Sequence, residues 1–139
     1  MMRVVVIDGQ GGGIGRQLVS RLREALPDVE IAAVGTNCCA TNAMLKAGAT
    51  SGATGENAVI VACRKADVIA GPIGIVIADS LGGEITPAMA VAVAQSSARR
   101  VLLPFNHCDN IIVGVADYNV ARLVQSAVEE VGRICAAES

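Results

Sequence analysis

The feature that most constrains this chain is a short apolar segment that runs directly into a cluster of glycines. Val4 to Ile7 are consecutive β-branched residues, which predicts a strand buried on both faces. Asp8 and the glycine-rich residues 9–15 follow at once, and apolar residues then recur at helical spacing at Ile14, Leu18, Leu22 and Leu26. A strand, a glycine turn and a helix in this order aim the N–H groups of a helix N-terminus at a bound anion. The sequence therefore predicts a binding site at this turn, without identifying a reaction.

The rest of the chain alternates apolar segments with amphipathic ones. The patterns predict strands over residues 3–8, 30–35, 68–71, 100–105 and 111–115, and helices over 13–25, 40–47, 56–65, 86–97 and from 117 onward. Thr54, Thr86 and Asp117 are the expected helix caps. Residues 75–81 suit a strand and a buried helix equally.

This alternation predicts an α/β fold, a three-layer α/β/α sandwich with a mostly parallel sheet, as a single domain over residues 1–139. Residues 106–110 are too short a connection for a parallel crossover. We therefore expect the last two strands to form an antiparallel edge pair.

Glycines and polar residues follow the predicted parallel strands. Ligands of such sheets bind beyond the carboxyl ends of the strands, so these residues are the predicted ligand-binding set. The set comprises Asp8, Gly9, Gln10, Gly11, Gly12, Gly13, Gly15, Thr36, Asn37, Thr54, Gly55, Glu56, Asn57, Gly71, Pro72 and Asn106.

Three side chains in or near this set are candidates for catalysis. Asp8 suits a metal or ribose ligand or a general base, and equally a cap on the backbone N–H groups that follow it. Glu56 suits an acid or base, or a residue of a helix start. His107 is the single histidine, so it is a candidate acid–base group opposite Asp8 and Gln10, or a surface residue.

Composition narrows the classes of partner. The net charge of −2, with one Tyr, one Phe and no Trp, argues against nucleic-acid binding, which needs basic patches and stacking platforms. Charges interrupt the apolar runs before the length of a membrane span, and the N-terminus resembles no signal peptide. We expect a cytoplasmic protein that acts on a small molecule and not on a membrane.

The cysteines and the small apolar residues carry two further expectations. Five cysteines without a CxxC pair indicate reduced thiols and no metal site. A core rich in Ala and Val buries little area per residue, which predicts that subunit contacts add to it. We expect a homo-oligomer, with the helix at 87–97 at its interface.

Gly9, Gly13 and Gly15 form a GxxxGxG pattern that resembles the cofactor turn of short-chain dehydrogenases. That resemblance implies a nicotinamide cofactor, NAD(P). An acidic residue is missing after the second strand, where Thr36 and Asn37 stand, and Tyr118 is followed four positions later by Arg122 in place of Lys. The likeness therefore covers one turn.

A longer set of motifs resembles a small bacterial family of uncharacterised Rossmann-like proteins. The motifs span 6–15, 35–37, 46–49, 52–58, 71–75 and 83–87. The resemblance implies a Rossmann-like fold and no particular activity. Three functions stay open: a domain that binds a nucleotide or phosphometabolite, a non-catalytic regulatory or assembly protein with structural glycine turns, and an NAD(P)-dependent oxidoreductase.

Overall fold

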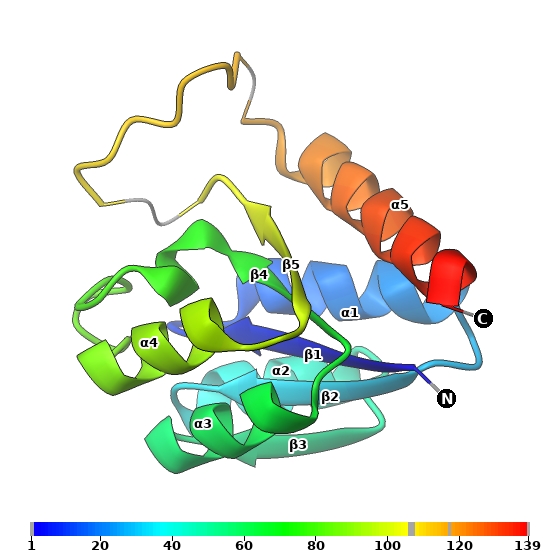
Figure 1. The fold of residues 1–139 in the computed structure, drawn as a ribbon, viewed down its shortest axis with the longest axis horizontal. Helices are drawn as coiled ribbons and strands as arrows, with labels where there is room; N and C mark the ends of the chain where they lie inside the picture. Colours follow the sequence, from blue (N-terminus) through cyan, green and yellow to red (C-terminus); the bar gives the residue numbers. More distant parts are fainter. Residues whose placement is uncertain (1, 106–107, 117, 139) are drawn as a thin grey trace.

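The structure is a computed structural model that describes residues 2–105, 108–116 and 118–138. These residues form a five-stranded sheet in the order β3-β2-β1-β4-β5, with every strand pair parallel (Figure 1). The elements are β1 (Arg3–Asp8), α1 (Gly13–Ala25), β2 (Glu30–Gly35), α2 (Cys38–Lys46), β3 (Ser51–Thr54), α3 (Glu56–Lys65), β4 (Val68–Pro72), the 3₁₀ helix η1 (Ile73–Val76), α4 (Pro87–Gln95), β5 (Arg99–Leu103) and α5 (Val120–Glu138).

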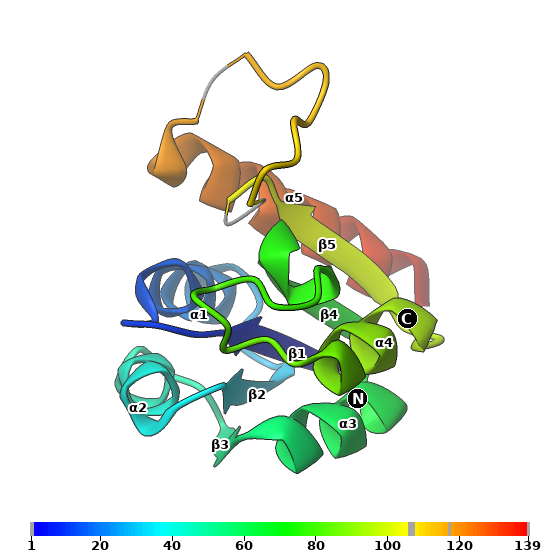
Figure 2. The same ribbon diagram turned by 90° about the vertical axis from the view of Figure 1, so that its left-hand side faces the viewer.

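Helices cover both faces of the sheet, which confirms the predicted three-layer α/β sandwich. Helices α1, α2 and α5 pack on one face and α3 and α4 on the other (Figures 1 and 2). The central strand β1 divides its side chains between the layers because successive residues of a strand point to opposite faces. Val4 and Val6 belong to the core under α1, and Val5 and Ile7 to the core under α3 and α4.

The order of the strands places a switch point next to β1. The chain leaves β1 toward β2 and β3, and then crosses back to add β4 on the other side of β1. Open parallel sheets bind ligands where the strand order reverses, beyond the carboxyl ends of the strands. Here that position lies beyond Asp8, where the glycine turn begins.

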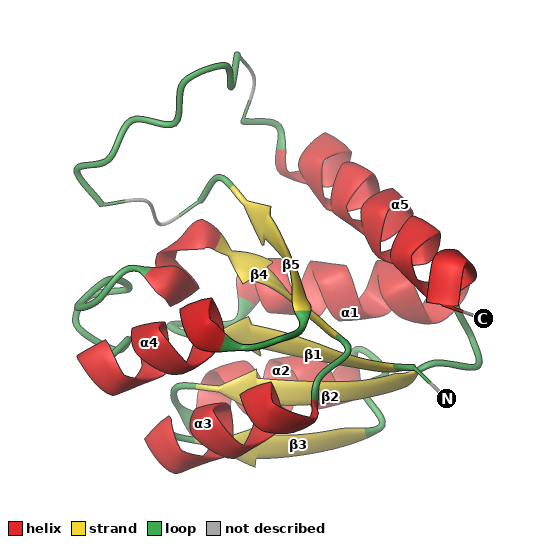
Figure 3. Cartoon of the chain, in the orientation of Figure 1, coloured by secondary structure: helices red, strands yellow, loops and turns green. Residues whose placement is uncertain are grey.

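The predicted antiparallel edge pair is wrong. The edge strand β5 pairs in parallel with β4, and residues 111–115 form a loop in Figure 3. Ile111 and Val113 are 88% and 93% exposed, so their apolar pattern does not report a buried strand. A strand needs a neighbour to satisfy its backbone groups, and here the chain passes from β5 to α5 instead.

Three local expectations also change. Ser51 to Thr54 form the edge strand β3 in place of a loop, and all four residues are exposed, so no alternating pattern marks them. Gly55, with φ 104°, precedes α3 as its cap residue, whereas Thr54 bonds to Thr41. Residues 73–76 form a 3₁₀ helix, which settles the ambiguous segment in part. The predicted cap Asp117 lies outside the described residues.

Candidate functional site

The glycine turn reverses the chain between β1 and α1. The N–H of Gly12 donates to the carbonyl of Gly9 at 2.9 Å. Gly12 has φ 74°, and a Cβ there would lie 2.9 Å from the Cα of Ala40. The turn therefore needs a glycine at this position, both for its left-handed backbone and for the close approach of α2.

Asp8 lies beneath the turn and is only 3% exposed. Its Oδ1 accepts from the N–H of Gly9 at 2.8 Å, and its Oδ2 from the N–H of Gly15 at 2.7 Å. Burial raises the pKa of this carboxyl; the N–H groups of Gly15 and Gly9 oppose that rise, and the charge of Glu84 adds to it. Of the roles considered for Asp8, this geometry fits the cap, since both oxygens already hold backbone N–H groups.

Other N–H groups of the turn stay open. Within the described part of the chain, the backbone N–H groups of Gly11, Gly13 and Ile14 donate to no acceptor. They adjoin a cavity of about 330 Å³ whose lining consists of residues 8–14, Gln17, Phe105 and Val120. A Cβ at Gly11 or Gly13 would meet no atom within 4 Å. The turn thus presents unused donors to open space at the N-terminus of a helix, where an anion is stabilised.

Glu84 holds the turn against the end of β2. Its Oε1 accepts from the N–H of Gln10 at 2.9 Å, from Oγ1 of Thr36 at 2.5 Å and from Nδ2 of Asn37 at 2.7 Å. The hydrogen bonds of Thr36 and Gln10 lower the pKa of this carboxyl, burial opposes them, and that of Asn37 lowers it further. The connection between β4 and α4, which contains η1, crosses the carboxyl edge of the sheet (Figure 2). Glu84 belongs to this connection.

From the sequence, Glu84 is a polar group close to this edge of the sheet, but a solvated carboxylate in a turn is the favoured interpretation, so the predicted ligand-binding set omits it. Nothing local shows that its partners lie 74 and 48 residues away. Gln17, Phe105 and Val120 were omitted as well, although an outward-facing residue in the first turns of α1, such as Gln17, was a usable signal.

The residues predicted around β3 lie farther along the same edge. Strand β3 is separated from β1 by β2, so Gly55, Glu56 and Asn57 start α3 away from the glycine-turn cavity. Oε1 of Glu56 accepts from Oγ1 of Thr86 at 2.6 Å. Since Thr86 caps α4, Glu56 ties the start of α3 to the start of α4.

Gly71 and Pro72 lie within β4 and are buried. A Cβ at Gly71 would lie 2.3 Å from the carbonyl oxygen of Ile7. A glycine is therefore needed here because β4 packs closely against β1. Asn106 and His107 lie outside the described residues, so their predicted place opposite Asp8 stays a prediction.

No group of three or more His, Cys, Asp and Glu side chains within residues 2–105, 108–116 and 118–138 is arranged to hold a metal ion. In the same ranges, every helix is too short or too polar to cross a membrane.

Comparisons with known proteins identify a family for the chain but no activity. A family described as a domain of unknown function matches residues 3–136, which confirms the resemblance to a family without an assigned activity. No curated protein matches the chain. Among solved structures, the chain is similar to a dodecameric FMN-dependent Ubix-like decarboxylase from Escherichia coli O157:H7, with 19% identity over 95% of each chain and a TM-score of 0.46. A likeness of this degree transfers neither function nor residue roles to this chain.

Proposed function

Since the chain belongs to the DUF3842 family, a domain of unknown function, we propose from its geometry that it binds the phosphate group of a small metabolite or nucleotide at the glycine turn. The phosphate would accept hydrogen bonds from the N–H groups of Gly11, Gly13 and Ile14. In this proposal Asp8 and Glu84 hold the turn in shape and do not contact the phosphate.

The observation that carries the proposal is the set of unused N–H groups beside a cavity. Asp8 takes the N–H of Gly15, and Glu84 takes that of Gln10. The N–H groups of Gly11, Gly13 and Ile14 therefore have no acceptor among the described residues, and are open to water or a ligand. A helix of 13 residues adds its dipole to these donors and favours a negative charge there.

The same geometry argues against the oxidoreductase alternative. In dinucleotide-binding domains, an acidic residue after the second strand binds the ribose of the cofactor. Here Thr36 and Asn37 follow β2, and both donate to Glu84. The position after β2 therefore offers no carboxylate of its own, and Oε1 of the neighbouring Glu84 already accepts three hydrogen bonds from protein donors.

We also propose that the protein forms a homo-oligomer through α4, which supports the assembly function as a second candidate. The outer side of this helix exposes Pro87, Ala88, Val91 and Ala94. Val91 is 50% exposed and lines a groove of about 590 Å³ between α3 and α4. Because all five cysteines are free thiols, we place this assembly in a reducing compartment, the cytoplasm.

The phosphate proposal is tested by substituting Gly13, where an added side chain enters open space. In Gly13→Glu a carboxylate would compete with the phosphate, whereas Gly13→Ala adds only a methyl group. Gly132→Glu is the matched control, because Gly132 lies in α5 and its Cβ would also meet no atom within 4 Å. Inorganic phosphate, ADP and a sugar phosphate serve as probes in thermal-shift and calorimetric titrations.

We expect the parent, Gly13→Ala and Gly132→Glu to be stabilised by the same probe. A probe at 100 times its Kd adds about 2.7 kcal/mol. Gly13→Glu should lose this gain, but without a probe it should melt at the same temperature as the parent, since an acidic residue in the first turn suits a helix. Equal binding by all variants would refute the proposal, and so would a parent that millimolar phosphate, ADP and sugar phosphate all fail to stabilise.

A further inference from the structure

Two stretches that meet beside the glycine turn contain positive charges and no negative ones. Residues 9–23 and 31–55 contain Arg16, Arg21, Arg23 and Lys46 and no Asp or Glu, in a chain whose net charge is −2. These stretches include most of α1 and all of α2, which pack side by side on one face of the sheet. The charge segregation therefore becomes a positively charged surface in the folded protein.

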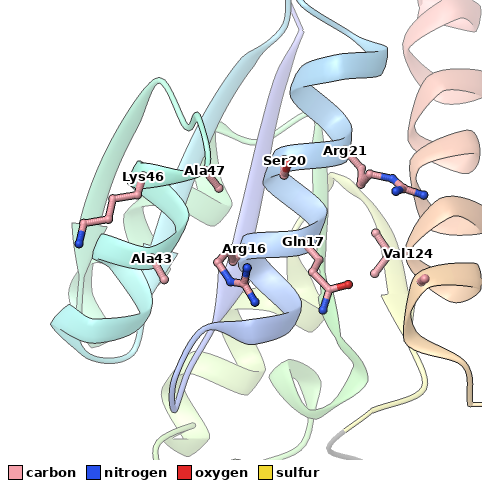
Figure 4. A pocket seen from close by; sticks show the side chains of 9 residues that line it. Arg16, Gln17, Ser20, Arg21, Ala43, Lys46, Ala47 and Val124 are labelled. Atoms are coloured by element: carbon pink, nitrogen blue, oxygen red, sulfur yellow. The ribbon is translucent and has the colours of Figure 1, made fainter.

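A trough of about 420 Å³ runs over this surface, across α1 and between α2 and α5. Small side chains leave the space open: Ser20 on α1, Ala43 and Ala47 on α2, and Ala121 on α5. Figure 4 shows Arg16 on the side of α1 that faces α2, and Arg21 extending toward α5. Lys46 lines the trough with its stem, but its ammonium group points away from α1 in this view, which leaves Arg16 and Arg21 as the cations of the trough.

The arginines of this surface differ in the number of hydrogen bonds that their side chains donate within the protein. Arg23 donates to the carbonyls of Gly48, Pro27 and Val29 and to Thr50, at 2.9 to 3.1 Å. It is a structural residue. Arg21 donates once, to the amide oxygen of Gln125 at 3.2 Å. Arg16 is exposed, and its guanidinium group has no hydrogen bond or ion pair with any described residue.

The helix geometry places the two arginines on either side of the trough. The backbone positions of Arg16 and Arg21 are about 7.5 Å apart along the axis of α1, at a rise of about 1.5 Å per residue. At about 100° per residue, Ser20 and Gln17 lie between them around the helix. The long side chains of the two arginines can thus approach one anionic group from two sides, with a hydroxyl and an amide between them.

The trough adjoins the glycine-turn cavity. Gln17 lines both spaces, and α5 borders both, through Val120 at the cavity and Ala121 at the trough. A ligand bound at the turn can therefore extend over α1. Its second part would meet Arg16, Gln17 and Arg21 in a region without carboxylates.

We propose that the ligand of this protein carries two anionic groups, as a diphosphate or bisphosphate does, and that the trough binds the second of them through Arg16 and Arg21. This inference rests on the proposed phosphate site at the turn. It narrows the substrate class from any phosphorylated compound to one with a second phosphate or an equivalent group close to the first. The chemistry is shared by a nucleoside diphosphate and by a diphosphate without a base.

The test compares the affinities of phosphate, pyrophosphate and ADP for the parent and for Arg16→Gln and Arg21→Gln, each measured by calorimetry at low salt. Arg64→Gln is the matched control, because Arg64 is an exposed arginine of α3 on the other face of the sheet. We expect the parent to bind pyrophosphate at least tenfold more tightly than phosphate. Each trough variant should reduce that ratio about tenfold, and Arg64→Gln should leave it unchanged. Tighter binding of ADP than of pyrophosphate would identify the nucleotide as the source, and equal binding the diphosphate alone.

A parent that binds phosphate and pyrophosphate equally, or trough variants that keep the parental ratio, would overturn the inference. The Gly13→Glu variant separates this failure from that of the proposed function. If Gly13→Glu no longer binds phosphate while the arginine variants keep the parental ratio of pyrophosphate to phosphate affinity, the phosphate site at the turn is supported and the role of the trough is refuted. If Gly13→Glu binds phosphate like the parent and the arginine variants no longer bind phosphate, the proposed site at the turn is refuted.

Discussion

Gly71→Ala should destabilise the protein strongly, although alanine is ordinarily the better residue in folded backbone. The added Cβ would lie 2.3 Å from the carbonyl oxygen of Ile7 and 3.2 Å from Cδ1 of Ile75. The first of these atoms belongs to the backbone of the central strand β1, which is paired on both sides. It cannot turn aside as a side chain can, so β1 and β4 must move apart.

The magnitude follows from what must move. Overpacking of a well-packed core costs about 1–3 kcal/mol, and we expect about 3 kcal/mol here because the obstruction is backbone. Gly13→Ala is the matched substitution, and we expect it to change the stability in the opposite direction. Its Cβ meets no atom within 4 Å, so restriction of the unfolded chain should stabilise the protein by about 0.4–1 kcal/mol.

Urea denaturation and thermal melting of both variants measure this difference. At about 4 °C per kcal/mol for a domain of this size, Gly71→Ala should lower Tm by about 10 °C and Gly13→Ala should raise it slightly. A Gly71→Ala variant with the parental Tm would refute the steric account of this glycine. Its predicted role in binding a ligand would then be the better explanation.

Four further outcomes are expected. Asp8→Asn should cost about 1–3 kcal/mol, because an amide accepts through one oxygen and leaves a buried N–H unpaired; urea denaturation should show no such loss for the exposed control Asp28→Asn. The pKa of Glu84 is lower in the folded protein than its ordinary value of 4.5, so the unfolded chain is protonated first as the pH falls. The stability that this carboxylate contributes is therefore present above pH 4.5 and is lost as the pH falls through the folded pKa. Denaturation from pH 7 to pH 3 should show that Glu84→Gln loses less stability in acid than the parent does. Val91→Arg should give a smaller species than the parent by light scattering, and a monomeric parent at all concentrations would rule out the α4 interface. NADH should bind weakly, because the position after β2 offers no free carboxylate, and tight saturable binding by fluorescence titration would restore the oxidoreductase.

The class of fold and the position of the turn could be predicted from the sequence because both depend on short-range patterns. The β-branched residues of β1 and the helical spacing of Leu18 and Leu22 report which side chains are buried. Gly12 is required by the backbone of its own turn. A strand, a turn and a helix joined in this order leave little freedom for the position of the helix N-terminus.

Tertiary structure alone decided the edges of the sheet. Strand β3 pairs with β2 through backbone groups while all its side chains are exposed, so its residues carry no alternating signal. Ile111 and Val113 carry an apolar signal without a strand. In both cases the presence of a neighbouring strand decides the outcome, and a local pattern contains no information about neighbours.

The composition of the site was also decided by the fold. Whether Glu84 is a solvated loop residue or a brace for the turn depends on a contact across 74 residues. Whether Arg16 and Arg23 are free or used depends on which carbonyls the packing of the helices brings within reach. The sequence by itself determined that a glycine turn would start α1 beyond the carboxyl end of β1, in a parallel sheet. Long-range packing determined which donors of that turn remain unpaired, because hydrogen bonds form with whatever acceptor the folded chain places within about 3 Å.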